Sequence, residues 1–235
     1  MKLTLENNLS EIKLDILQRL TKEEDKLKAV DLFFDLIVCK DKDSFADYDR
    51  ALLFNKWSKA SEISIEESPL KFSIGGRTFH SHYLDLGEHK IPTLLNMQLA
   101  FLIELTNLEI EYETYRAFDN VAALMYREDW TKPFDQKEYL SNALFFNQQK
   151  SKYSIWGVQK MQELYMAMRE AFPILYDGDQ ENGRTDGRKM MDLLNIASGD
   201  NPSKWNDARN TSIADVFGWM EEKKIEHINK KLKER

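Results

Sequence analysis

Apolar residues recur at intervals of three and four along most of this 235-residue chain, which is the spacing of one helix face. Near the N-terminus this pattern predicts a helix that starts at about Ser10, with Ser10 as its N-cap. A second helix is predicted from the capping-box pair Thr21 and Glu24 to about Cys39. A third is predicted over residues 44–58. The first quarter of the chain is therefore expected to be helical.

The apolar spacing changes to every second residue between Phe72 and Phe79, which is the spacing of a strand. Gly75 and Gly76 lie at the centre of this stretch, and two glycines readily supply the positive φ angles of a tight hairpin turn. We therefore predict a β-hairpin here. A further short strand is predicted over Glu62–Ile65, in the polar connector that precedes the hairpin.

Helical spacing returns after the hairpin. The predicted helices cover Thr93–Leu105, Glu111–Arg127, Gln136–Gln149, Ile155–Ala171, Lys189–Ala197 and Ser212–Arg235. The fold class that follows is mostly α, a helical bundle with one small β-hairpin inserted. We expect three parts: N-terminal helices in 1–69, a central hairpin with a helical core in 70–175, and a loop, short helix and protruding C-terminal helix in 176–235.

The terminal helix changes character along its length. Its front half carries a full apolar face, whereas its back half is almost entirely charged and keeps only a thin apolar seam. A helix of this kind is typical of an element that projects from the body and docks on a partner. The basic side chains near its end either complement the helix dipole or contact an acidic partner surface. The predicted interface residues are Ile213, Phe217, Met220, Ile225, Ile228 and Leu232.

Charge and composition narrow the function classes. The net charge of −7 argues against a general nucleic-acid binder and against attraction to anionic membranes. One cysteine excludes an internal disulfide, and no apolar run reaches the ~20 residues of a membrane-spanning helix. The sequence also begins without the apolar segment of a signal peptide. We therefore expect the protein in the cytoplasm or in a particle assembled there.

Two histidines are separated by one residue in the return strand of the predicted hairpin, so their side chains are expected to point the same way. His80 and His82 are followed by Asp85 and His89, and these four side chains supply enough donors for a metal site. Their spacing matches no metal motif, so a structural or surface role is preferred. We predict no catalytic residue, no metal and no cofactor. A small soluble metal-dependent enzyme is the alternative.

The polar loop 177–187 has alternating oxygen-bearing side chains, as in the first half of a calcium-binding EF-hand loop. Such a loop requires glycine at its sixth position and glutamate at its twelfth. Counting from Asp177, these positions hold Asn182 and Arg188. The loop is therefore interpreted as a solvent-exposed turn.

The stretch 70–130 resembles structural and assembly proteins of tailed bacteriophages, especially those of the crAss-like phages of Bacteroidetes. The resemblance rests on the hairpin Phe72–Phe79, on the leucine-rich segment Leu94–Leu105 and on a helix that ends in ALMYRED, residues 123–129. In that group the last helix finishes with a leucine, a tyrosine and an arginine before a proline-bearing loop, which here is 128–133. The methionine in this run departs from the usual aliphatic residue.

The resemblance implies a non-enzymatic virion structural protein, made in the host cytoplasm. It favours a head–tail connector, a ring or adaptor subunit at the portal vertex. The expected partners are copies of itself in a ring, the portal and other tail or connector proteins. DNA would pass through the lumen without specific binding, and no membrane is involved. The alternative within this class is a tail assembly chaperone that is not retained in the virion.

A ring subunit needs two different surfaces for a head-to-tail contact. We expect the terminal helix, Ser212–Arg235, to be one of them. The loop 177–187 is a candidate for the second contact or for a position facing the lumen.

Overall fold

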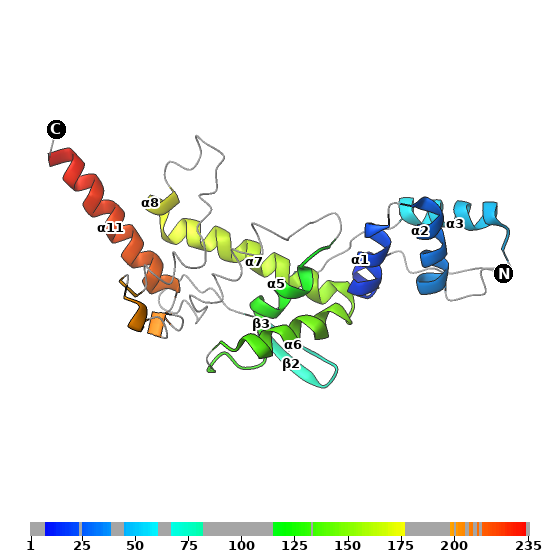
Figure 1. Cartoon of the computed structure of the whole chain (residues 1–235), viewed down its shortest axis with the longest axis horizontal. Helices are drawn as coiled ribbons and strands as arrows, with labels where there is room; N and C mark the ends of the chain where they lie inside the picture. Colours follow the sequence, from blue (N-terminus) through cyan, green and yellow to red (C-terminus); the bar gives the residue numbers. More distant parts are fainter. Residues whose placement is uncertain are drawn as a thin grey trace.

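The computed structural model of the chain is elongated, with helical units at both ends of a central body (Figure 1). It is mostly α with one small antiparallel sheet, which confirms the predicted fold class. The predicted division into three parts stays a prediction. The residues that the structure describes are 8–23, 25–38, 45–60, 67–81, 115–132, 134–176, 198–199, 201–204, 207–208, 211 and 213–233.

Three helices form the central body. The longest, α7 (Ser151–Ala171), packs against α5 (Phe118–Met125), and α6 (Gln136–Asn147) packs against both. Gly157 allows the closest approach, because a Cβ atom placed there would lie 2.4 Å from the Cα of Ala122 on α5. Backbones this close leave room for hydrogen only, so the crossing of α5 and α7 depends on this glycine.

The small sheet has three strands in the order β1 (Lys71–Ile74), β2 (Arg77–Ser81) and β3 (Tyr126–Arg127). The turn glycines Gly75 and Gly76 have φ angles of 57° and 76°, and the predicted hairpin is confirmed. The third strand was not predicted. Its two residues were assigned to the helix that precedes them, but they pair with the end of β2.

The helix predicted over 111–127 is shorter in the structure. Tyr115 and Ala117 have φ angles of 56° and 62°, a left-handed conformation that cannot continue an α-helix, so α5 begins only at Phe118. At its other end Tyr126 has extended backbone, and its hydroxyl donates to the carbonyl oxygen of Pro69 at 2.9 Å. Both ends of the predicted helix were therefore wrong. A left-handed turn at Tyr115 and Ala117 replaces the start of the helix, and strand pairing of Tyr126 replaces its end.

The first helix also begins later than predicted. A 3₁₀ turn, η1 (Leu9–Glu11), is capped by Asn8, and α1 (Leu14–Lys22) follows it. Ser10 therefore caps neither the 3₁₀ turn nor α1. Between them, the carbonyl oxygen of Ile12 accepts from the backbone N–H of Ser151 at 2.7 Å. The backbone N–H of Leu14 donates to Gln149 in the same way, at 3.0 Å. This pairing ties the N-terminal segment to the start of α7.

Helix α2 (Lys26–Phe33) starts at Asp25, whose carboxylate accepts from the backbone N–H groups of Leu27 and Lys28. The predicted capping box was wrong, because Thr21 lies inside α1 and donates its hydroxyl to the carbonyl oxygen of Leu17. Aspartate caps as well as threonine, so the competing cap was one turn further along the sequence.

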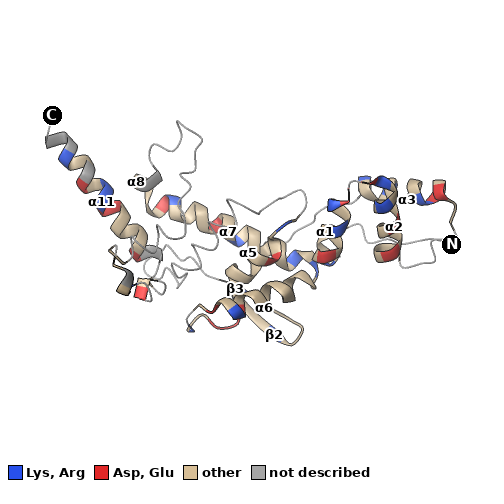
Figure 2. Cartoon of the chain, in the orientation of Figure 1, with Lys and Arg blue, Asp and Glu red and all other residues tan. Residues whose placement is uncertain are grey.

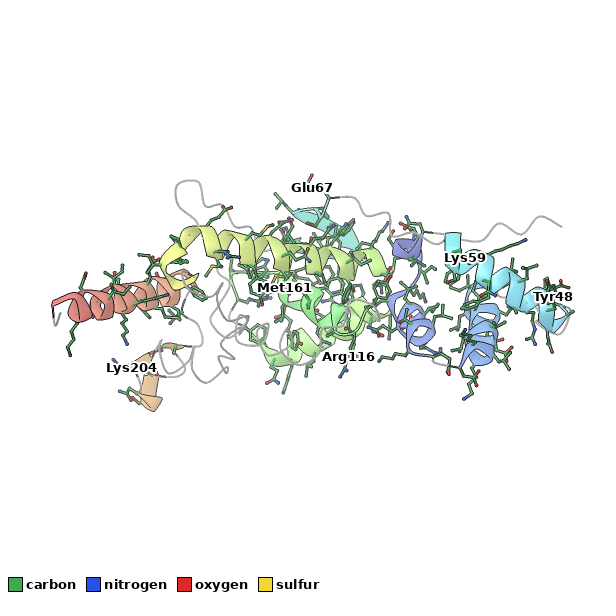
Figure 3. The ribbon with its side chains drawn as sticks, turned by 90° about the horizontal axis from the view of Figure 1, so that it is seen from above. Tyr48, Lys59, Glu67, Arg116, Met161 and Lys204 are labelled. Carbon is green, nitrogen blue, oxygen red and sulfur yellow. The ribbon has the colours of Figure 1, made fainter. Side chains whose placement is uncertain are left out.

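Helix α2 continues into a π-helical turn, η2 (Phe34–Val38), and α3 (Asp47–Ala60) packs back against α2. We call these three elements the N-terminal unit. Its aromatic side chains contact one another edge-on or tilted, with ring centroids 4.8–6.2 Å apart. Figure 3 shows α3 reaching from Lys59 out to Tyr48, near the end of the molecule. Together with Phe45, which precedes α3, the ring cluster consists of Phe33, Phe34, Phe54 and Trp57.

Two predicted helices appear close to their expected bounds, namely α6 and α7. A short helix, α8 (Pro173–Tyr176), follows α7, and a 3₁₀ turn, η4 (Pro202–Lys204), precedes the terminal helix. Among the residues that the structure describes, no helix is both long and apolar enough to cross a membrane. The following predicted segments lie outside the described residues: Glu62–Ile65, Thr93–Leu105, the loop 177–187 and Lys189–Ala197.

Candidate docking interface

The terminal helix α11 (Ile213–Lys233) is anchored to the body by its first two turns. Val216, Phe217 and Met220 are buried. The ring of Phe217 lies 5.7 Å from the ring of Phe172, which directly follows α7. We call residues 213–221 the root of the helix.

The root ends with a polar contact at Glu221. Its carboxylate accepts a hydrogen bond from the backbone N–H of Ile174 at 3.1 Å, in the first turn of α8. A free N–H at a helix start is a favourable partner for a carboxylate. Glu221 therefore attaches α11 to α8 at the point where the helix leaves the body.

Beyond Glu221 most of the described side chains of the helix lie in solvent. We call residues 222–233 the shaft. Every described side chain from Glu222 to Lys230 is exposed except Lys224, which is half-buried. Figure 1 shows the shaft leading away from the body, and Figure 2 shows basic and acidic residues interspersed along it. The apolar side chains of Ile225 and Ile228 are 38% and 42% exposed.

The predicted interface residues fall into two groups. Phe217 and Met220 lie in the root and are buried within the chain, whereas Ile225 and Ile228 lie on the exposed shaft. The side chains of Ile213 and Leu232 lie outside what the structure describes. Ile225, Ile228 and Leu232 keep the spacing of three and four that brings apolar residues onto one helix face. The interface itself stays a prediction.

A second apolar surface lies at the opposite end of the molecule, on the N-terminal unit. Leu27 of α2 is 74% exposed, and Tyr48 and Leu52 of α3 are 77% and 41% exposed. Tyr48 and Leu52 are four residues apart and therefore neighbours on the helix surface. In the sequence these two residues support only the helix predicted over 44–58. No sequence signal marks their face as exposed, because apolar residues have the same spacing on a buried helix face and on a free one.

The central body contains a charged cluster at the hairpin. The guanidinium of Arg77 donates to both carboxylate oxygens of Glu128, at 3.0 and 2.9 Å. It also lies 4.9 Å from the ring centroid of Phe79 and 4.8 Å from that of Phe145. Arg77 lowers the pKa of the Glu128 carboxyl. The guanidinium thus holds the hairpin to α6 and to the loop after β3.

A second polar cluster surrounds Asp119 in the first turn of α5. Its carboxylate accepts from the side-chain amide of Asn147 at 3.2 Å, and the same amide also donates to Gln18. Burial raises the pKa of Asp119. The partners lie on α1 and α6, far apart in sequence, so no local pattern predicts this cluster. It connects three helices at the left-handed turn before α5.

A third cluster fixes the segment before the hairpin on α7. The hydroxyl of Ser68 donates to Glu163 at 3.0 Å, and the ammonium of Lys160 donates to the same carboxylate at 2.7 Å. Tyr126 is fully buried beneath this segment, and burial raises the pKa of its phenol. Each of these polar side chains has a partner within the chain, so the cluster is interpreted as an attachment.

The predicted histidine site can be followed only in part. His80 lies in β2, opposite Arg127, and its carbonyl oxygen accepts from the indole N–H of Trp130 at 2.8 Å. His82, Asp85 and His89 lie outside the described residues. Within the part of the chain that the structure describes, no group of three or more metal-binding side chains comes together. The metal hypothesis therefore stays a prediction without support from this region.

Similarity to known proteins adds nothing to these observations. No protein-family model, curated protein sequence or solved structure matches this chain.

Proposed function

We propose that this chain is a non-enzymatic assembly protein, which works by docking its C-terminal shaft onto other protein subunits. The observation that carries the proposal is the contrast within α11. Its root is buried and hydrogen-bonded to the body, whereas its shaft carries exposed isoleucines in solvent. An isolated charged helix of this length is marginal in water, so a helix held out by its root gains stability when a partner covers it.

Within this class, we propose a head–tail connector subunit of a tailed bacteriophage, which forms a ring on the portal or on the tail. Support comes from the resemblance of residues 70–130 and from the elongated form of the molecule (Figure 1). A subunit with distinct surfaces at its two ends is suited to head-to-tail contacts around a ring. Copies of the chain, the portal and neighbouring tail proteins are the proposed partners.

Quantitative mass spectrometry of purified virions tests this function. Virions purified from infected cells that produce the chain are expected to contain it at a fixed number of copies. This number should be comparable with that of other portal-vertex proteins. Its absence from mature virions, together with its presence in the lysate, would contradict the connector function. That result would favour the tail assembly chaperone instead.

A deletion locates the interface in the same system. Removing residues 222–235 leaves the root and the Glu221 contact intact, so the chain is expected to fold but not to enter the virion. Incorporation of the truncated chain at the normal copy number would show that the shaft is not the docking element.

A further inference from the structure

The apolar seam of the shaft is flanked by different residues on its two sides. Lys224 lies four residues before Ile228 and Lys231 lies three residues after it, so both are neighbours of Ile228 on one side of the helix. The other side of the seam holds Glu222 and Asn229. The seam is therefore basic along one side only.

Two further lysines of the shaft lie away from the seam. Lys223 and Lys230 are seven residues apart, as Lys224 and Lys231 are, and both are exposed. They lie two and five residues from Ile225, so they do not share its face of the helix. The shaft thus contains two lysine pairs of equal spacing, one beside the seam and one behind it.

The end of the chain differs in charge from the rest. Residues 222–235 contain six lysines and arginines and three glutamates, so in a chain of net charge −7 the other residues carry −10. Positive charge is therefore concentrated on the element that also leaves apolar side chains exposed. Surfaces that meet in a specific interface have complementary potentials, so a basic flank selects a partner with carboxylates opposite it.

We propose that the shaft docks in an apolar groove of a partner subunit, whose rim carries aspartates and glutamates opposite Lys224 and Lys231. This inference rests on the proposed function and names the chemistry of the partner surface. Ile225, Ile228 and Leu232 have the spacing i, i+3 and i+7 by which an amphipathic helix occupies an apolar groove. The apolar residues supply affinity, and the charged residues beside them determine partner and orientation.

The same residues argue against a membrane or a nucleic acid as the surface that the shaft meets. Its apolar face is a narrow seam, and residues 222–235 contain no Trp, Tyr or Phe. A helix that lies on an anionic membrane has a broad apolar face in which such residues are common. Three glutamates among the basic residues oppose a contact with phosphates. A protein groove with an acidic rim fits both features.

Carbodiimide treatment of purified virions tests the proposal. This reagent joins a lysine to a carboxylate in contact with it through an amide bond, with loss of water, and mass spectrometry identifies the two peptides. Lys224 and Lys231 are expected to be joined to Asp or Glu outside residues 213–235, whereas Lys223 and Lys230 are expected to form no such bridge. Bridges from the second pair only, or equal bridges from both pairs, would overturn the proposal.

Charge reversal in the full chain provides a matched pair of variants. Lys224→Glu with Lys231→Glu reverses the flank of the seam, and Lys223→Glu with Lys230→Glu makes the same change in net charge behind it. Glutamate is a good helix former, so both variants should fold, which circular dichroism checks. The first variant is expected to be lost from virions, and the second to enter them at the wild-type copy number. Equal incorporation of the two variants would overturn the assignment of the flank.

The wild-type virions separate this inference from the proposed function. A chain present at a fixed copy number, with no bridge from Lys224 or Lys231 to a carboxylate of a neighbour, would overturn the acidic groove and leave the connector function in place. A wild-type chain that is absent from virions would contradict the connector function, and the inference would fall with it.

Discussion

The central body and the shaft of α11 treat apolar side chains in opposite ways. In the body, Phe146 and Leu124 are fully buried, and α5 and α7 approach closely enough that only a glycine fits between them. On α11, Ile225 and Ile228 of the shaft are exposed, and Gly218 of the root has open space around it. The buried core of the body therefore stabilises the protomer, whereas the two isoleucines of the shaft stay available to a partner.

This difference separates folding from association. Apolar area that is buried within the chain stabilises the protomer, at roughly 25 cal/mol per Å². Apolar area left in solvent contributes nothing to the protomer and becomes favourable only when another molecule covers it. Substitutions in the body should therefore change unfolding, and substitutions on the shaft should change association without changing unfolding.

The largest expected effect follows from emptying the core. Phe146→Ala should reduce the free energy of unfolding by about 3–5 kcal/mol, because the ring is fully buried and its loss leaves a cavity. Ile228→Ala on the shaft should change it by less than about 0.5 kcal/mol. Urea denaturation followed by circular dichroism measures both. Equal effects of the two substitutions would remove the distinction between body and shaft.

The helix crossing provides a sharper pair of variants. Gly157→Ala should destabilise the protein by about 1–3 kcal/mol, because the new methyl group meets the backbone of Ala122. Gly218→Ala meets nothing within 4 Å and should stabilise α11 by up to about 1 kcal/mol, since alanine favours a helix. Thermal unfolding midpoints should thus shift in opposite directions. A shift in the same direction would contradict the described crossing.

A smaller effect is expected where the body attaches the hairpin. Tyr126→Phe removes the hydroxyl that donates to Pro69 and should cost about 1 kcal/mol, because the buried carbonyl loses its partner. Tyr48→Phe, on the exposed end of α3, is the matched control and should leave unfolding unchanged. The midpoints of urea denaturation, compared at a common m-value, measure both changes. An equal change in the two variants would contradict the described hydrogen bond.

The smallest effect is a pH dependence. Burial raises the pKa of Asp119, so the folded chain holds the neutral carboxyl better than the carboxylate. The stability associated with this group is highest below its ordinary pKa of 3.8 and falls as pH rises through the raised value. Asp119→Asn should therefore gain stability relative to the wild type as pH rises from 4 to 7. A constant difference across this range would contradict the described burial of the carboxylate.

Local patterns predicted the parts of the fold that depend on local chemistry. The two turn glycines specified the hairpin, and apolar spacing placed α6, α7 and α11. The third strand and the late start of α5 could not be predicted, because they depend on contacts of Tyr126 with Pro69 and of Tyr115 with Gln18. These residues lie far apart in the sequence.

The candidate interface shows the same limit. The thin seam of the shaft was visible as an apolar pattern among charges. The exposure of Tyr48 was not, because the same spacing describes a helix face that is buried and one that is free. Only the packing of Phe33, Phe54 and Trp57 on the other side of the N-terminal unit shows which face of α3 is left at the surface.

The most direct test compares the full chain with a chain that ends at Glu221, by light scattering and thermal unfolding of the same samples. The truncated chain keeps the buried root and the hydrogen bond to Ile174. We predict that it stays at the mass of one protomer while the full chain self-associates, and that both chains unfold at the same temperature at a dilution where each is a single protomer. A truncated chain that associates like the full chain, or that no longer folds, would contradict the division between body and shaft.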